Sequence, residues 1–223
     1  MKRLELYGDS ILKGVMYVPE QGRYRLCNDG RFSPVEEQGY AVRNHSRMGA
    51  TIHKGISSLE RAERYDEDTL VVLEYGGNDC DYDWQQIAND PNGSFLPHTP
   101  EGEFLDGYRR AVELAREKGA QVAILSMIPI DAQKYFSWIS RNADAQNILR
   151  WLGDVSMLSR WQEYYSRLVE GLAKALHCPL IDTRQVFLQS HRFSDLLCAD
   201  GIHPTQAGHD LIGEHIAAYL QTA

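Results

Sequence analysis

The sequence has little cysteine, and it has neither a long apolar run nor a cluster of basic residues. Its cysteines are widely spaced and form no CxxC pair, so we expect free thiols and neither a disulfide framework nor a zinc site. No segment approaches the roughly 20 apolar residues of a membrane span, and the N-terminus lacks the apolar stretch of a signal peptide. These absences favour a cytoplasmic protein without a membrane partner. The cysteines are Cys27, Cys80, Cys178 and Cys198.

Charge and motifs exclude further classes. The formal net charge is -8 at pH 7 and no run of Lys and Arg occurs, so nucleic acid is not expected as a partner. Neither a P-loop nor a G-x-G-x-x-G motif occurs, which leaves no case for a nucleotide cofactor. The sequence also lacks H-E-x-x-H, and the acidic string Asp79, Asp81 and Asp83 has neither the glycine nor the distal glutamate of a calcium loop. We expect no cofactor, no metal and a solvated acidic loop.

What the chain does contain is typical of one globular domain. Its 223 residues are 43% hydrophobic and 24% charged, so residues 1–223 can bury a single sizeable core. Apolar residues three and four apart predict helices around 53–64, 104–115, 161–172 and 212–220. Five short apolar runs between and before them predict strands at 4–7, 41–44, 69–75, 121–128 and 179–183.

Strands that alternate with helices predict an α/β fold with a five-stranded parallel sheet covered on both faces. In such sheets ligands bind outside the carboxyl ends of the strands, so functional residues should follow strands. Two stretches, about 16–40 and 131–160, do not fit the alternation and are expected to be insertions that leave this side of the sheet. Their aromatic residues either roof a pocket or anchor surface segments to the core.

Four sequence blocks follow the predicted strands. They are "GDS" with Ser10, "HSRMGAT" with Gly49, "YGGNDCD" with Asn78, and "CADGIHPTQAGH" with Asp200 and His203. Each block alone is typical of a helix cap, a turn or a loop. Together they supply what acyl transfer needs, because the parallel strands bring them to one edge.

A serine hydroxyl is a poor nucleophile until an imidazole takes its proton, and a carboxylate must hold that imidazole in the right tautomer. Asp200 and His203, three residues apart across a tight turn, can supply both groups to Ser10. The tetrahedral intermediate also needs hydrogen-bond donors. The Asn78 amide and the backbone N–H groups of Gly49 and Ser10 are the candidates.

In this order, the four blocks resemble the signature blocks of the SGNH, or GDSL, family of serine hydrolases, from residue 7 to about 205. The resemblance implies a flavodoxin-like three-layer α/β/α sandwich. It implies Ser10 as nucleophile, Gly49 and Asn78 as oxyanion donors, His203 as general base and Asp200 as its orienting acid. Ile11 replaces the usual leucine after "GDS". Gly39 and Gly55 are alternatives to Gly49, which the "RMGAT" context favours.

The expected function is hydrolysis of a carboxylic ester through an acyl-Ser10 intermediate. The substrate is expected to be a small soluble ester, and an acetylated saccharide is one candidate because aromatic side chains of residues 131–165 could stack on sugar rings. An acyltransferase or a thioesterase could use the same site. The alternative of another class is a non-catalytic flavodoxin-like binding domain in which Asp9 and Ser10 only cap a helix. The sequence leaves the oligomeric state open.

Overall fold

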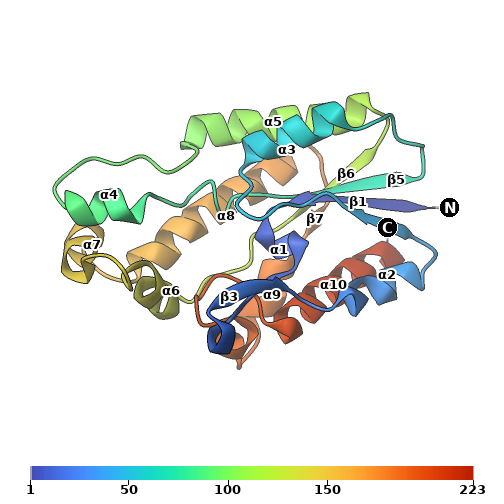
Figure 1. The fold of residues 1–223 in the computed structure, drawn as a ribbon. Coiled ribbons are helices and arrows are strands. Elements are labelled where there is room, and N and C mark those ends of the chain that lie inside the picture. The colour runs from blue at the N-terminus through green and yellow to red at the C-terminus, as the bar shows by residue number, and fades with distance from the viewer. Residues whose placement is uncertain (1, 223) are drawn as a thin grey trace.

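The computed structural model describes residues 2–222, and for Asp29 the backbone alone. Its centre is a five-stranded parallel sheet with the order β4-β1-β5-β6-β7 (Figure 1). The predicted α/β class with five parallel strands is confirmed, and this strand order is the flavodoxin-like one. The strands are β1 (Arg3–Gly8), β4 (Ala41–Asn44), β5 (Thr69–Glu74), β6 (Gln121–Leu125) and β7 (Leu180–Ile181).

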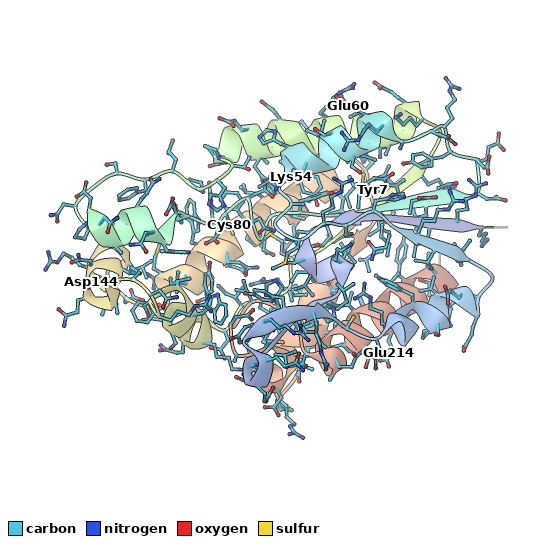
Figure 2. The ribbon with its side chains drawn as sticks, in the orientation of Figure 1. Tyr7, Lys54, Glu60, Cys80, Asp144 and Glu214 are labelled. Carbon is cyan, nitrogen blue, oxygen red and sulfur yellow. The ribbon has the colours of Figure 1, made fainter. Side chains whose placement is uncertain are left out.

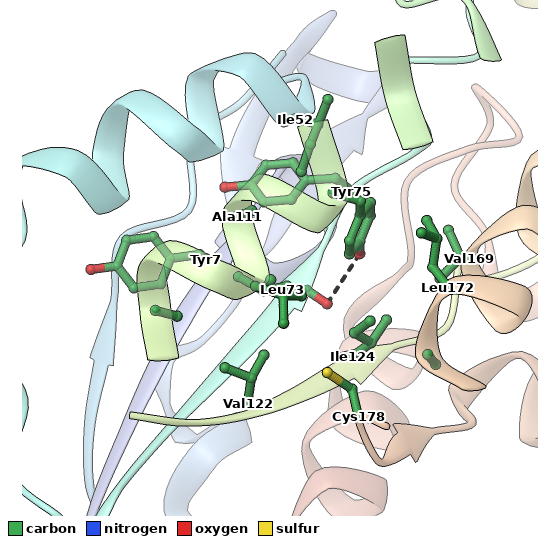
Figure 3. Close-up of a cluster of buried hydrophobic side chains, with 14 of the residues drawn as sticks. Tyr7, Ile52, Leu73, Tyr75, Ala111, Val122, Ile124, Val169, Leu172 and Cys178 are labelled. Atoms are coloured by element: carbon green, nitrogen blue, oxygen red, sulfur yellow. Dashed lines mark hydrogen bonds between the residues drawn. The ribbon is translucent and has the colours of Figure 1, made fainter. Parts of the chain in front are cut away.

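The neighbouring strands β1 and β5 place apolar side chains on both faces, as a sheet covered on both sides requires. Leu6 of β1 pairs with Val72 of β5, and both side chains belong to the core on one face. The next pair, Tyr7 and Leu73, belongs to the core on the opposite face (Figure 3). A one-residue slip would exchange the two faces, so this alternation fixes the register at the strand ends.

Helices form a layer on each face of the sheet. Figure 1 shows α3, α5 and α8 on one side and α2, α9 and α10 on the other. The first layer is α3 (Ile52–Arg61), α5 (Glu101–Glu117) and α8 (Met157–Ala175). The second layer is α2 (Ser33–Glu36), α9 (Thr183–Leu188) and α10 (Gln206–Thr222). The four long helices α3, α5, α8 and α10 confirm the predicted ones.

Several short elements extend beyond the carboxyl ends of the strands or lie beside them. Figure 1 shows α4, α6 and α7 together at that end of the molecule. These elements are α1 (Ser10–Lys13), β2 (Val15–Val18), η1 (Pro19–Gln21), β3 (Arg23–Leu26), η2 (Asp29–Phe32), α4 (Trp84–Asn89), α6 (Ala132–Ile139), α7 (Ala145–Leu152) and η3 (Phe193–Leu196).

The structure corrects the sequence prediction in three places. The last two strands end earlier than predicted, β6 at Leu125 and β7 at Ile181. In β7 the reason is that Asp182 accepts a hydrogen bond from the Gln185 N–H at 3.1 Å and starts α9. Residues 15–26 form an antiparallel hairpin, β2 and β3, that the polar, glycine-rich sequence does not predict. The acidic string is not a solvated loop: Asp79 is fully buried and accepts from the Ile52 N–H at the start of α3, at 3.0 Å.

Candidate active site

Ser10 is the first residue of α1, directly after β1. The cap of this short helix is Asp9, whose Oδ1 accepts from the Ile11 N–H at 2.8 Å. The Ser10 hydroxyl is therefore not used for capping. Its Oγ lies 2.9 Å from Nε2 of His203, although the two residues are 193 positions apart in the chain.

A tight turn after η3 contains Asp200 and His203, the two residues that the sequence predicts to act with Ser10. Oδ1 of Asp200 accepts from the backbone N–H groups of Ile202, at 3.2 Å, and His203, at 3.1 Å. Oδ2 of the same carboxylate lies 2.7 Å from Nδ1 of His203. Gly201 turns the chain at φ +75°, where side chains are disfavoured. Asp200 thus holds both the backbone and the imidazole ring of His203 in place.

The tautomer of the neutral imidazole follows from these contacts. A carboxylate accepts hydrogen bonds and cannot donate, so Nδ1 of His203 carries the proton that faces Asp200. Nε2 then has a free lone pair and accepts from the Ser10 hydroxyl. Both Asp200 and His203 are buried, which keeps the contact between them out of water.

Asn78 follows β5 and lies beside Asp9. Its amide nitrogen donates to Asp9 Oδ2 at 2.9 Å and to the Ala50 carbonyl at 3.1 Å, so both amide hydrogens have protein acceptors. Gly49 lies one residue before Ala50, is exposed, and has φ +67°. Its loop is tied to β1 by the Arg47 N–H, which donates to the Gly8 carbonyl at 3.1 Å.

The alternatives to Gly49 are placed differently. The Gly39 N–H bonds the Glu36 carbonyl at 2.9 Å, and Gly39 precedes β4, at the opposite edge of the sheet. The Gly55 N–H bonds the Thr51 carbonyl at 3.2 Å inside α3. Within residues 2–222, the N–H groups of Gly49 and Ser10 have no protein acceptor. The loop after β4 therefore offers a free donor at Gly49.

A cavity of about 100 Å³ lies beside Ser10 and His203. In the view of Figure 2, Cys80, which lines the cavity, lies between Tyr7 of the sheet and Asp144, the residue that precedes α7. The lining residues are Asp9, Ser10, Ile11, Glu74, Gly77, Asn78, Cys80, Asp81, Tyr82, Trp84, Met127, Ile128, Ile130, Tyr135, Trp151, Leu152, Met157, Leu158, Trp161, Gln162, Ile202 and His203. Ser10, Asn78 and His203 thus meet at one cavity, whereas Gly49 and Asp200 do not line it.

Residues 6–211 match the model of the GDSL-like lipase/acylhydrolase family. The chain belongs to this family. Solved structures with the same fold include a member of the lipolytic G-D-S-L family from Veillonella parvula, with 17% identity, a TM-score of 0.66 and 100% of both chains covered. A lipase/acylhydrolase from Enterococcus faecalis has 16% identity, a TM-score of 0.59, and coverage of 100% of this chain and 96% of its own.

An acetyl xylan esterase has 19% identity and a TM-score of 0.63 over 98% of this chain and 99% of its own. A search of curated protein sequences finds no match. Family membership makes the chain an SGNH-type esterase. In the part of the GDSL hydrolase that the structure describes, no group of three or more His, Cys, Asp and Glu side chains is placed to hold a metal ion. None of the helices within residues 2–222 has the length and apolar character to cross a membrane.

The GDSL hydrolase also buries a carboxyl pair that the sequence analysis missed. Glu74 ends β5, and its Oε2 accepts from the Asp9 N–H at 3.3 Å. Gly8 leaves the room for it, because a Cβ at that position would lie 2.8 Å from Glu74 Oε2. A glutamate that ends an otherwise apolar strand was the available sequence signal. Burial raises the pKa of Asp9 to about 6, and burial followed by the charge of Asp9 raises the pKa of Glu74 well above its usual value.

The buried pair of Asp9 and Glu74 should make the free energy of unfolding depend on pH. Above pH 4.5, the usual pKa of a glutamate, the unfolded chain releases the Glu74 proton while the folded chain retains it. Stability is therefore lost as the pH rises towards the folded-state pKa, by up to roughly 1 kcal/mol for each pH unit. Glu74→Gln cannot ionise, so we expect the difference in unfolding free energy, variant minus wild type, to increase from pH 5 to pH 8.

Urea unfolding at each pH measures this difference. The control is Glu36→Gln, which changes an exposed glutamate of α2 and should give a difference that does not vary in the same way. A constant difference for Glu74→Gln would show that Glu74 is ionised in the folded protein throughout this range.

Proposed function

We propose that this GDSL hydrolase cleaves carboxylic esters through an acyl intermediate on Ser10. The main support is the chain of contacts from Ser10 Oγ to His203 Nε2, 2.9 Å, and from His203 Nδ1 to Asp200 Oδ2, 2.7 Å. A nucleophile, a base and an orienting carboxylate are the groups that acyl transfer to serine requires. A non-catalytic binding domain, in which Asp9 and Ser10 only cap a helix, does not account for these contacts, because Asp9 alone makes the cap and the Ser10 hydroxyl lies against His203.

In the proposed reaction, Ser10 Oγ attacks the ester carbonyl while His203 Nε2 takes its proton. The protonated imidazole is stabilised by Asp200 and then gives the proton to the leaving alkoxide, which departs as an alcohol. Water attacks the acyl-Ser10 ester, His203 takes a proton from that water, and the acid leaves as Ser10 regains its hydrogen. An acyltransferase or a thioesterase would share the acylation step and would differ in the acceptor or in the leaving group.

The proposed oxyanion donors are the N–H groups of Ser10 and Gly49 and the amide of Asn78. The two backbone groups have no protein acceptor within residues 2–222, which leaves them available. Asn78 is different, because its second amide hydrogen is bonded to the Ala50 carbonyl. In this proposal the amide keeps its bond to Asp9 and exchanges the carbonyl of Ala50 for the oxyanion.

The proposed substrate is a small ester. An acetylated carbohydrate is one form of it, and the fold neighbour that is an acetyl xylan esterase is consistent with such a substrate. The aromatic residues of 131–160 divide between two places: Trp151 lines the cavity beside Ser10, whereas Trp138 packs on Tyr17 with ring centroids 4.4 Å apart. Stacking on a sugar ring would therefore involve Trp151 rather than Trp138.

The decisive experiment uses p-nitrophenyl acetate, butyrate and octanoate with the wild type, Ser10→Ala and His203→Ala. We expect Ser10→Ala to abolish turnover and His203→Ala to lower kcat by at least ~10³, because the hydroxyl or its base is lost. An organophosphate followed by mass spectrometry should label Ser10 in the wild type. Circular dichroism and urea unfolding confirm that both variants are folded. Undiminished turnover by folded His203→Ala, or a label on another residue, would overturn the proposal.

Asn78→Ala tests the oxyanion assignment separately. Loss of one donor to the transition state should lower kcat by about 10² to 10³ with a smaller change in KM. Asn89→Ala, at an exposed asparagine of α4, is the matched control and should leave both constants unchanged. A change in KM alone would show that Asn78 binds the ground state of the substrate and contributes nothing specific to the transition state.

A further inference from the structure

The cavity beside Ser10 has a mostly apolar wall from segments far apart in the chain. Met127 and Ile128 follow β6, Trp151 lies on α7, and Leu158 and Trp161 lie on α8. Met127, Ile128 and Leu158 are almost inaccessible to water, with exposed fractions of 2%, 5% and 5%. Because these side chains close the space on the side of the molecule that faces the core, a group that enters it leaves water.

The polar side chains in this wall are already paired. Asp81 Oδ1 accepts from the Tyr135 hydroxyl at 2.6 Å and from Trp84 Nε1 at 2.9 Å. Gln162 donates to the Ile128 carbonyl at 2.7 Å and accepts from Arg184 at 3.0 Å. A sugar hydroxyl in the cavity would compete with these bonds, whereas an aliphatic chain would leave them intact.

The volume limits the length of such a chain. An engineered apolar cavity of about 150 Å³ holds benzene, which is roughly 25 Å³ for each carbon atom. On this scale the cavity of about 100 Å³ holds about four carbon atoms. An acetyl group would leave most of it empty, and a decanoyl group would have to extend through its mouth.

We propose that this cavity binds a short aliphatic acyl chain, from butanoyl to hexanoyl, in the ester that Ser10 attacks. The inference rests on the proposed function and deepens it. The alcohol must leave before water can attack, so an enclosed cavity suits the acyl part, which stays on Ser10 between the two steps. The structure thereby favours a short-chain ester over an acetate as substrate.

The test is kcat/KM for p-nitrophenyl acetate, butyrate, hexanoate, octanoate and decanoate. We expect a maximum at butyrate or hexanoate, about 10-fold above acetate, because each buried methylene contributes to binding. Trp151→Ala enlarges the cavity and should move the maximum to octanoate or beyond. Met157→Trp fills it and should move the maximum to acetate. Leu149→Ala, at an exposed position of α7, is the control and should leave the profile unchanged.

A second series varies the alcohol from methyl to hexyl in butanoate esters and should give a nearly flat profile. A flat acyl profile, or dependence on the alcohol alone, would overturn the assignment of the cavity while turnover that requires Ser10 still supports the proposed function. Loss of Ser10-dependent turnover and of labelling would instead refute the proposed function. Trp151→Ala and Met157→Trp should shift the preferred chain length in opposite directions. If one of these variants does not fold, the other still tests the assignment.

An independent observation concerns the β2–β3 hairpin. Its Tyr24 ring packs edge-on against the His203 ring, with centroids 5.1 Å apart and an interplanar angle of 62°. Burial, followed by the charge of Asp200, raises the pKa of the Tyr24 hydroxyl above its usual value, so this hydroxyl lies near the Asp200 carboxylate. Trp138 of α6 packs against the same hairpin, with its ring centroid 4.4 Å from that of Tyr17 and 6.1 Å from that of Tyr24. One tyrosine thus packs on His203 and interacts electrostatically with Asp200.

We infer that Tyr24 is a positioning residue, that its ring holds the His203 ring by packing, and that its hydroxyl donates to the Asp200 carboxylate that also accepts from His203. A carboxylate that loses one donor holds a protonated imidazole more strongly. Tyr24→Phe keeps the ring and removes the hydroxyl, so the acid limb of the kcat/KM profile should move to higher pH by at least ~0.3 units while KM changes little. Other titratable groups also act on Tyr24 and His203: Asp9 and His209 interact electrostatically with His203, and Arg141 and Tyr17 with Tyr24.

Tyr17→Phe is the control, because Tyr17 is on the same hairpin and its ring packs on Tyr24 and Trp138 rather than on His203. Its acid limb should coincide with that of the wild type. A Tyr24→Phe profile with an unmoved acid limb would overturn the inference, whatever the change in kcat. Tyr24→Leu removes the ring as well and should lower kcat further than Tyr24→Phe.

Discussion

The parallel pairing of β1 with β4 on one side and β5 on the other is the constraint on which the site depends. The register sets Gly8 against Glu74, so β1 and β5 end at one level, and it sets Leu6 against Asn44, so β4 ends two residues earlier. The chain leaves β1 and β5 in opposite directions along the sheet, which opens a crevice at their carboxyl ends. Ser10 follows one of these strands and Asn78 the other. Backbone hydrogen bonds thus place the proposed nucleophile beside the proposed oxyanion donor.

Asp9 converts this placement into a defined geometry. One carboxylate oxygen caps α1 through the Ile11 N–H, and the other accepts from the Asn78 amide. A buried carboxylate is costly unless donors surround it, so the position of α1 and the position of Asn78 cannot change independently. Glu74 places a second buried carboxyl group next to Asp9 and makes part of the folding free energy dependent on pH. The aspartate of the "GDS" block is therefore a structural link between two segments of the proposed active site.

The sequence predicted the elements whose pattern is local. Continuous apolar runs such as 69–74 have the signature of buried parallel strands, and strand ends carried the residues with suitable chemistry. The hairpin was missed because β3, "RYRL", is mostly exposed and is held by Tyr17, Tyr24 and Trp138 through contacts more than 100 residues apart in the chain. Glu74 was missed for a related reason: its partner Asp9 is 65 positions away. Contacts across such separations leave no periodicity in a single sequence.

The outer helices differ in how closely they are tied to the proposed triad. The Asp131 N–H at the start of α6 donates to the Gly201 carbonyl at 2.9 Å, and a Cβ on Gly201 would lie 2.5 Å from the Tyr135 nitrogen. A change in α6 therefore reaches the turn that holds Asp200 and His203. By contrast, α7 supplies Trp151 and Leu152 to the cavity and packs on α4, away from that turn. The physical separation makes α7 the element in which the acyl cavity can be reshaped while the hydrogen bonds from Ser10 to Asp200 stay in place.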